Sequence, residues 1–191
     1  MVLRRIAVTG GPGAGKTSVW RELTSAHGRI AAVPEVATAL FQHVFPSVQS
    51  LDERRAVQRA IFEVQRNLEA IHDARMTPDQ VLLCDRGVPD GAGYWPEGPA
   101  AFFEAMGVDW QAQLLRYDAV LFLETAAAGG ISIREGNPVR TETNEAAVRV
   151  DRQLREVWQR HPNCCFIAHE REFETKLTRG SEQLRAWLAG H

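Results

Sequence analysis

The segment from Gly10 to Thr17 combines residue types and a spacing that bind phosphate. It reads GGPGAGKT and fits the pattern G-x-x-x-x-G-K-[ST] at every fixed position. Glycines let successive backbone N–H groups converge on phosphate oxygens, in conformations that a Cβ atom hinders. A helix that follows such a loop adds its free N–H groups and its dipole to the anion site. The predicted phosphate-contacting residues are Gly10, Gly11, Pro12, Gly13, Ala14, Gly15, Lys16, Thr17 and Ser18.

Three side chains have further predicted roles in handling a nucleoside triphosphate. Lys16 should reach the β- and γ-phosphates, which makes it a candidate catalytic residue. The hydroxyl of Thr17 should bind Mg²⁺. A second metal ligand is predicted at Asp85, because the apolar run at 81–84 is typical of a buried strand that ends in an acid. In this Walker B arrangement the carboxylate holds the ion directly or through water.

These residues need a parallel sheet to bring them together. Apolar runs recur at 3–9, 30–33, 80–84, 119–123 and 164–168, and helical patterns lie between them. Alternation of this kind predicts parallel strands covered by helices on both faces. We therefore expect a three-layer α/β/α fold with a five-stranded parallel sheet, in a single nucleotide-binding domain over residues 1–191.

Helices are predicted over about 51–75 and 144–160, and from 173 to about 187–188. The stripe expected to be buried in the first helix contains Val57, Ile61, Val64, Leu68 and Ile71. The charged residues expected to lie off that stripe are Arg55, Arg59, Glu63, Arg66 and Glu69. Thr143 is the expected N-cap of the second helix.

Two segments interrupt the alternation where chemistry is expected. Residues 86–99 are rich in glycine and proline, directly after the third strand, and could shape a substrate pocket or form an ordinary surface loop. Residues 126–143 begin with small residues and carry Arg134 and Arg140. They could form a hinged lid whose arginines stabilise charge on a transferring phosphoryl group, or a solvated loop.

The pair Asp85-Arg86 resembles the Asp-Arg or Glu-Arg pair of nucleoside and nucleotide kinases. In that group the arginine contacts the substrate or the transferred phosphate, so the resemblance implies a catalytic role for Arg86. A carboxylate near the end of the second strand accepts the proton of the attacking hydroxyl in the same kinases. Glu35 lies at that place. The alternative for Glu35 is the first turn of a helix, since Pro34 before it also suits a helix start.

Nearly the whole chain resembles one family, the AAA-type domain shared by two kinds of protein. These are the nicotinamide riboside kinase part of bacterial NAD-biosynthesis regulators and an insect photoreceptor-trafficking GTPase. The matching residues are Gly10–Thr17, Pro34-Glu35, Asp85-Arg86-Gly87 with Asp90 and Tyr94, Tyr117-Asp118, and Pro138-Val139-Arg140. The resemblance implies the sheet order 2-3-1-4-5 and ATP as phosphoryl donor. Family members often continue the strand-two glutamate with an aromatic residue, alanine and arginine, whereas here Val36-Ala37-Thr38 follows Glu35.

Three functions are compatible with these residues. The first is a Mg²⁺-dependent kinase that transfers the γ-phosphate of ATP to a hydroxyl of a small-molecule acceptor. The second is a regulator that hydrolyses ATP or GTP slowly and signals by its shape. The third, a degenerate scaffold, is disfavoured because Lys16, Thr17 and Asp85 are all in place. GTP is less favoured than ATP, since the sequence contains no Asn-Lys-x-Asp guanine reader.

Charge and composition limit the kinds of partner that the protein could bind and the cellular compartment in which we expect it. The net charge of −2 predicts no binding to nucleic acid, and no apolar run approaches the length of a membrane span. The phosphate-binding loop follows the start of the chain so closely that removal of a signal peptide would destroy it. Three cysteines make no disulfide framework. We therefore expect a cytoplasmic protein.

Overall fold

The described residues, 3–26, 28–132 and 143–189 of a computed structural model, form a sheet of five parallel strands. The strands are β1 (Arg5–Thr9), β2 (Ile30–Val33), β3 (Val81–Asp85), β4 (Ala119–Leu123) and β5 (Cys164–Ile167). They lie in the order β2-β3-β1-β4-β5, and all neighbouring pairs are parallel. The predicted order 2-3-1-4-5 is confirmed.

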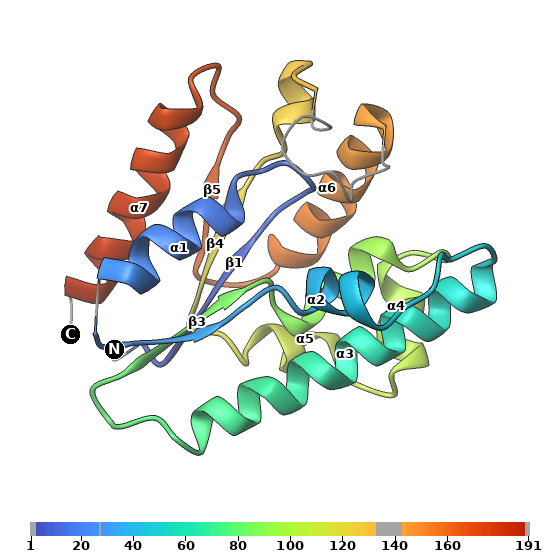
Figure 1. The fold of residues 1–191 in the computed structure, drawn as a ribbon, viewed down its shortest axis with the longest axis horizontal. Helices are drawn as coiled ribbons and strands as arrows, with labels where there is room; N and C mark the ends of the chain where they lie inside the picture. Colours follow the sequence, from blue (N-terminus) through green and yellow to red (C-terminus); the bar gives the residue numbers. More distant parts are fainter. Residues whose placement is uncertain (1–2, 27, 133–142, 190–191) are drawn as a thin grey trace.

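Helices cover both faces of this sheet (Figure 1). One layer contains α1 (Lys16–Ala26) and α7 (Phe173–Ala189). The other contains α3 (Leu51–Asp73), the 3₁₀ helix η1 (Val88–Tyr94), α4 (Pro99–Ala105), α5 (Trp110–Leu114) and α6 (Asn144–Trp158). The short α2 (Val36–His43) leads from β2 toward α3, and the 3₁₀ helix η2 (Ala126–Gly129) follows β4. Among the described helices, none is both long and apolar enough to cross a membrane.

Alternate residues of the central strands supply the two cores. Ala7 and Phe122 belong to the core under η1 and α6, whereas Ile6 and Leu121 belong to the core under α1 and α7. Strands covered on both faces need apolar residues at nearly every position, which explains why they appear in the sequence as continuous runs. The carboxyl ends of β1, β2 and β3 then lie along one edge of the sheet. The predicted phosphate-binding, metal-binding and acceptor residues follow these three strands.

The predicted buried stripe of α3 is wrong in part. Val64 and Ile71 are 41% and 48% exposed, whereas Glu69, predicted to lie off the stripe, is fully buried. Glu69 accepts hydrogen bonds from Arg5 (3.2 Å) and Arg116 (2.7 Å), so the charged groups satisfy one another under the helix. Counting apolar residues alone could not reveal a helix that buries a paired carboxylate.

The glycine-rich segment after β3 is folded rather than an open loop. Most of it forms η1, which is buried beneath α3 and α6, with Val88 and Ala92 in the core. The glycines allow close packing: a Cβ atom at Gly93 would lie 2.6 Å from the side chain of Leu154. The segment still leaves β3 at the edge expected for ligand binding.

Candidate active site

The predicted phosphate-binding loop connects β1 to α1. Gly10 and Gly15 have φ values of 130° and 89°, a region that favours glycine. A Cβ atom at Gly10 would also lie 1.9 Å from the carbonyl oxygen of Leu123, so only glycine fits there. Among the described residues, the N–H groups of Gly15, Lys16 and Thr17 find no acceptor. Such a cradle of unpaired N–H groups fits an anionic phosphate.

Lys16 lies inside this loop with only 4% of its surface exposed. Its Nζ donates a hydrogen bond to the carbonyl oxygen of Gly11 at 2.8 Å. Burial, and then repulsion from Arg86, lower the pKa of Lys16 to about 7, although nearby carboxylates oppose the shift. A bound phosphate would add negative charge beside the ammonium and so favour its protonated form.

Thr17 and Asp85, the predicted metal ligands, are brought together from α1 and β3. The hydroxyl of Thr17 donates to Oδ2 of Asp85 at 2.8 Å. The other oxygen, Oδ1, is buried and has no hydrogen-bond partner among the described residues. Burial raises the pKa of Asp85 to about 6, assisted by the negative charge of Glu35. A buried oxygen without a partner is costly, and a divalent cation beside it would remove that cost, so these residues fit Mg²⁺.

Glu35 and Arg86 form an ion pair beside the loop. The backbone of Glu35 begins α2, but its side chain makes no capping bond to the helix. One carboxylate oxygen accepts from Nε of Arg86 and the other from the hydroxyl of Thr38 at 2.7 Å. Burial opposes ionisation, yet the charges of Arg86 and Lys16 prevail and lower the pKa of Glu35 to about 2.

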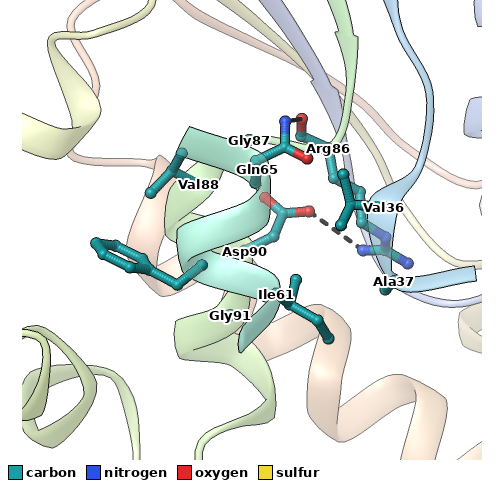
Figure 2. A pocket seen from close by; sticks show the side chains of 10 residues that line it. Val36, Ala37, Ile61, Gln65, Arg86, Gly87, Val88, Asp90 and Gly91 are labelled. Atoms are coloured by element: carbon teal, nitrogen blue, oxygen red, sulfur yellow. Dashed lines mark hydrogen bonds and ion pairs between the residues drawn. The ribbon is translucent and has the colours of Figure 1, made fainter. Parts of the chain in front are cut away.

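Arg86 is held from several sides. Its φ of 78° is unusual for a residue other than glycine, and such backbone strain is common at functional sites. Its Nη1 donates to Asp90 at 3.1 Å, and the guanidinium lies 5.5 Å from the centre of the Tyr94 ring. The side chain of Gln65 donates to the carbonyl oxygen of Arg86 at 3.3 Å. Figure 2 shows Asp90 and Gln65 directed at Arg86 from different elements.

Asp90 forms more of the hydrogen bonds that hold this site together than its position in the sequence indicated. The hydroxyl of Thr9, the last residue of β1, donates to it at 2.8 Å, and so does the indole Nε1 of Trp158 in α6. Asp90 therefore links Arg86 to the sheet and to a helix whose residues are far away in sequence. Its place in the family resemblance was the one signal that singled it out.

A small cavity lies behind the ion pair, between α2, α3 and η1 (Figure 2). Its volume is about 20 Å³, enough for about one water molecule. Gln65, Arg86 and Asp90 supply its polar lining. Trp95, from the glycine- and proline-rich segment 86–99, packs edge-on against Phe102 in the core.

A much larger cleft, of about 610 Å³, runs over the phosphate-binding loop. Lys16 and Thr17 lie on its floor, together with Trp20 from α1. Toward α2 it is lined by Glu35 and Thr38. Predicted phosphate and metal residues thus share one cleft with Glu35, whereas Arg86 lines the small cavity beside it.

Phe173, which the sequence did not single out as a site residue, lines the same cleft. Its ring lies against Gly15, where an added Cβ atom would be 2.7 Å away, and 47% of its surface is exposed. The contact joins the first residue of α7 to the loop before α1, so no local pattern could have indicated it.

The predicted lid is described only at its ends. Ala126 and Ser132 line the cleft, and Thr143 caps α6 by accepting from the N–H of Ala146 at 3.2 Å. Arg134 and Arg140 lie outside the described residues.

Comparisons with known proteins identify the family of the chain and agree with its fold. A sequence profile of the AAA domain matches residues 5–176. No curated protein matches the sequence. Solved structures that match include deoxyadenosine kinase from M. mycoides, once with the products dCMP and a flexible dCDP bound and once with dATP bound. In both comparisons the TM-score is 0.60 and the identity 14%, over 95% of this chain and 99% of that chain.

Proposed function

The chain belongs to the AAA domain family, and from this premise we propose that it is a Mg²⁺-dependent kinase. It would transfer the γ-phosphate of ATP to a hydroxyl group of a small-molecule acceptor. The observation that carries the proposal is the position of Glu35, which lines the same cleft as Lys16 and is held there by its ion pair with Arg86. A protein that only held a nucleotide would need no ionised carboxylate, half-buried and paired with a guanidinium, beside the phosphates.

The nucleotide phosphates would lie in the loop from Gly10 to Ser18, with Lys16 on the β- and γ-phosphates. Thr17 and Asp85 would hold Mg²⁺, which neutralises charge on the phosphate oxygens when bound. Arg134 and Arg140 are proposed to stabilise the transferring phosphoryl group, a role that suits the planar guanidinium.

At the acceptor end, Glu35 would orient the attacking hydroxyl. With a pKa of about 2 it stays ionised at neutral pH, and it accepts a hydrogen bond from the acceptor without first having to lose a proton. Arg86 would contact the acceptor or the transferred phosphate. Its bonds to Glu35 and Asp90 fix it for that contact.

Nucleosides and compounds like them are the first acceptors to test, because the solved kinase of this fold carries dCMP and dCDP as products. ATP is favoured as donor, since the sequence lacks the guanine reader and the same kinase binds dATP. We propose a cytoplasmic location: all three cysteines are free thiols, as is usual in reducing compartments. With a net charge of −2, nucleic acid is not a proposed partner.

One observation favours the second function, a nucleotide-switched ATPase or GTPase. The cavity beside Arg86 has room for about one water molecule, so an acceptor molecule could not enter it in this conformation. An acceptor would have to bind in the open cleft instead.

The deciding experiment is a screen of ATP consumption by the purified protein against nucleosides, nucleotides, ribosides and amino sugars. A kinase should show turnover that depends on one acceptor and yields its phosphorylated form. A Lys16→Ala variant should lose turnover while it keeps its fold, because the ammonium group would bind phosphate and, among the described residues, now bonds only to the backbone of the loop at Gly11. Acceptor-independent hydrolysis that the same variant abolishes would instead support the switch.

A further inference from the structure

The phosphate-binding loop is also bound from its outer side, by a residue with no role in the proposed chemistry. Oδ1 of Asp151, in α6, accepts a hydrogen bond from the backbone N–H of Gly11 at 2.8 Å. The same oxygen accepts from the N–H of Thr125 at 2.9 Å. The hydroxyl of Thr125 in turn donates to the carbonyl oxygen of Pro12. One carboxylate thus ties the loop to the end of β4.

A third side chain completes this arrangement. Lys176, in α7, donates from Nζ to the carbonyl oxygens of Ala14 and Glu124. We call Asp151, Thr125 and Lys176 the outer clasp. It engages one backbone group each of Gly11, Pro12 and Ala14, and leaves the N–H groups at the end of the loop without an acceptor among the described residues.

Asp151 has no other described contact that would account for its burial. It is 4% exposed, and no ion pair reaches it from the described residues. Burial raises its pKa, while the two N–H bonds act in the opposite direction. Lys16 and Lys176 attract the carboxylate without forming an ion pair with it, so the two backbone bonds are its direct stabilisation. The approach is close, since a Cβ atom at Gly11 would lie 2.6 Å from Oδ1.

We propose that Asp151 is a positioning residue for nucleotide binding. By holding the N–H of Gly11 it fixes the first half of the loop, so that the N–H groups of Gly15, Lys16 and Thr17 are already arranged for phosphate. Preorganised donors bind an anion without the cost of ordering the chain. The inference rests on the proposed nucleotide site and adds a residue that never touches the ligand.

Asp118 offers a matched control. Its Oδ2 accepts hydrogen bonds from the backbone N–H groups of Arg4 (2.6 Å) and Arg5 (2.8 Å). Like Asp151, it therefore holds two backbone N–H groups with one carboxylate oxygen. It does so at the beginning of β1, whereas Asp151 acts just beyond the end of β1. Its loss should destabilise the fold without reaching the loop.

The experiment compares Asp151→Ala, Asp151→Asn and Asp118→Ala by calorimetric titration with Mg²⁺-ATP and with tripolyphosphate, which has no base. Asp151→Ala should weaken binding of both by about tenfold or more, because misplaced donors lose most of their value. Asp151→Asn should recover most of the affinity, since an amide oxygen can accept the same two bonds. Asp118→Ala should lower Tm and leave both affinities unchanged.

Hydrogen exchange of the amides at residues 10–18 tests the loop without any ligand. Exchange should be faster in Asp151→Ala and unchanged in Asp118→Ala. Parental affinity in Asp151→Ala, equal losses in Asp118→Ala, or unchanged exchange in the loop would each overturn the proposal. If the parent protein binds neither ligand, the proposed function fails, and the exchange rates still decide whether Asp151 orders the loop.

Discussion

The carboxylate of Glu35 does not cap the helix that its own residue begins. Its backbone starts α2, as a helix start after Pro34 would suggest, but its side chain bonds to Arg86 and Thr38. The two interpretations of the sequence are therefore compatible, because one concerns the backbone and the other the side chain. A pKa of about 2 keeps this group ionised at neutral pH, the form that can accept the proton of an acceptor hydroxyl.

Glu35→Gln should reduce acceptor phosphorylation by roughly 10²–10⁴-fold, the usual contribution of general-base assistance. Nucleotide affinity should barely change, because Lys16, Thr17 and Asp85 are untouched. Steady-state kinetics on the screened acceptor, run beside ATP titrations, measure both quantities. Full activity in the variant would remove Glu35 from the mechanism and favour the nucleotide switch.

Asp85→Asn should lower Mg²⁺-dependent activity more than it lowers nucleotide binding. The amide keeps the shape and can still accept from Thr17, but it removes the charge that attracts the metal. Activity across a Mg²⁺ titration should shift to higher metal concentration. Superimposable titrations of variant and parent would contradict the metal assignment.

At the scale of elements, α3 depends on its buried carboxylate. Glu69 accepts from Arg5, Arg116 and the hydroxyl of Tyr117, the last at 2.6 Å. Its removal takes the ion-pair partner from Arg116 and leaves Arg5 with the more exposed Asp73 as its one described ion-pair partner, and breaking a buried pair costs about 3–5 kcal/mol. Glu69→Leu should therefore lower the free energy of unfolding by about that amount in urea titrations.

Glu63→Leu, on the same helix, is the control for this prediction. Its ion pair with Arg66 is exposed and 3.5 Å long, so its loss should change stability by less than about 0.5 kcal/mol. Similar losses for the two variants would show that the helix, and not the buried network, sets the stability.

The elements also show where prediction from sequence succeeds. The strands and their order follow from apolar runs and from the family resemblance, since a sheet covered on both faces leaves a strong local signal. The bonds of Asp90 to Trp158 and of Asp151 to Gly11 span 68 and 140 residues. The periodicity of a sequence cannot indicate contacts between residues so far apart. These two hydrogen bonds, which hold the site in place, could therefore be identified only from the structure.

At the scale of the whole molecule, stability should depend on pH through Lys176. Burial lowers the pKa of Lys176 from 10.5 to about 8, against the attraction of Asp151 and Glu124. Between these two values the unfolded chain binds the proton and the folded protein does not, so the contribution of Lys176 to stability rises with pH. Below pH 8 both states are protonated and the contribution is constant.

The comparison with Lys176→Met isolates this effect. Relative to the variant, the parent should gain up to roughly 1.4 kcal/mol of unfolding free energy per pH unit between about pH 8 and 10. Urea unfolding at pH 7, 8, 9 and 10 gives the difference directly. A difference that does not change with pH would show that the buried amine keeps its ordinary pKa.

The cleft also contains an optical reporter. Trp20 lines it, and its indole Nε1 donates to the carbonyl oxygen of Leu83 at 3.0 Å, which fixes the ring beside the phosphate-binding loop. Indole emission responds to the polarity and charge around it, so a bound Mg²⁺-nucleotide should shift the intrinsic fluorescence of the protein. Trp20→Phe should abolish that shift, because the four other tryptophans are not among the residues that line the cleft. Nucleotides and acceptors could then be ranked by titration without a label, before any product is known.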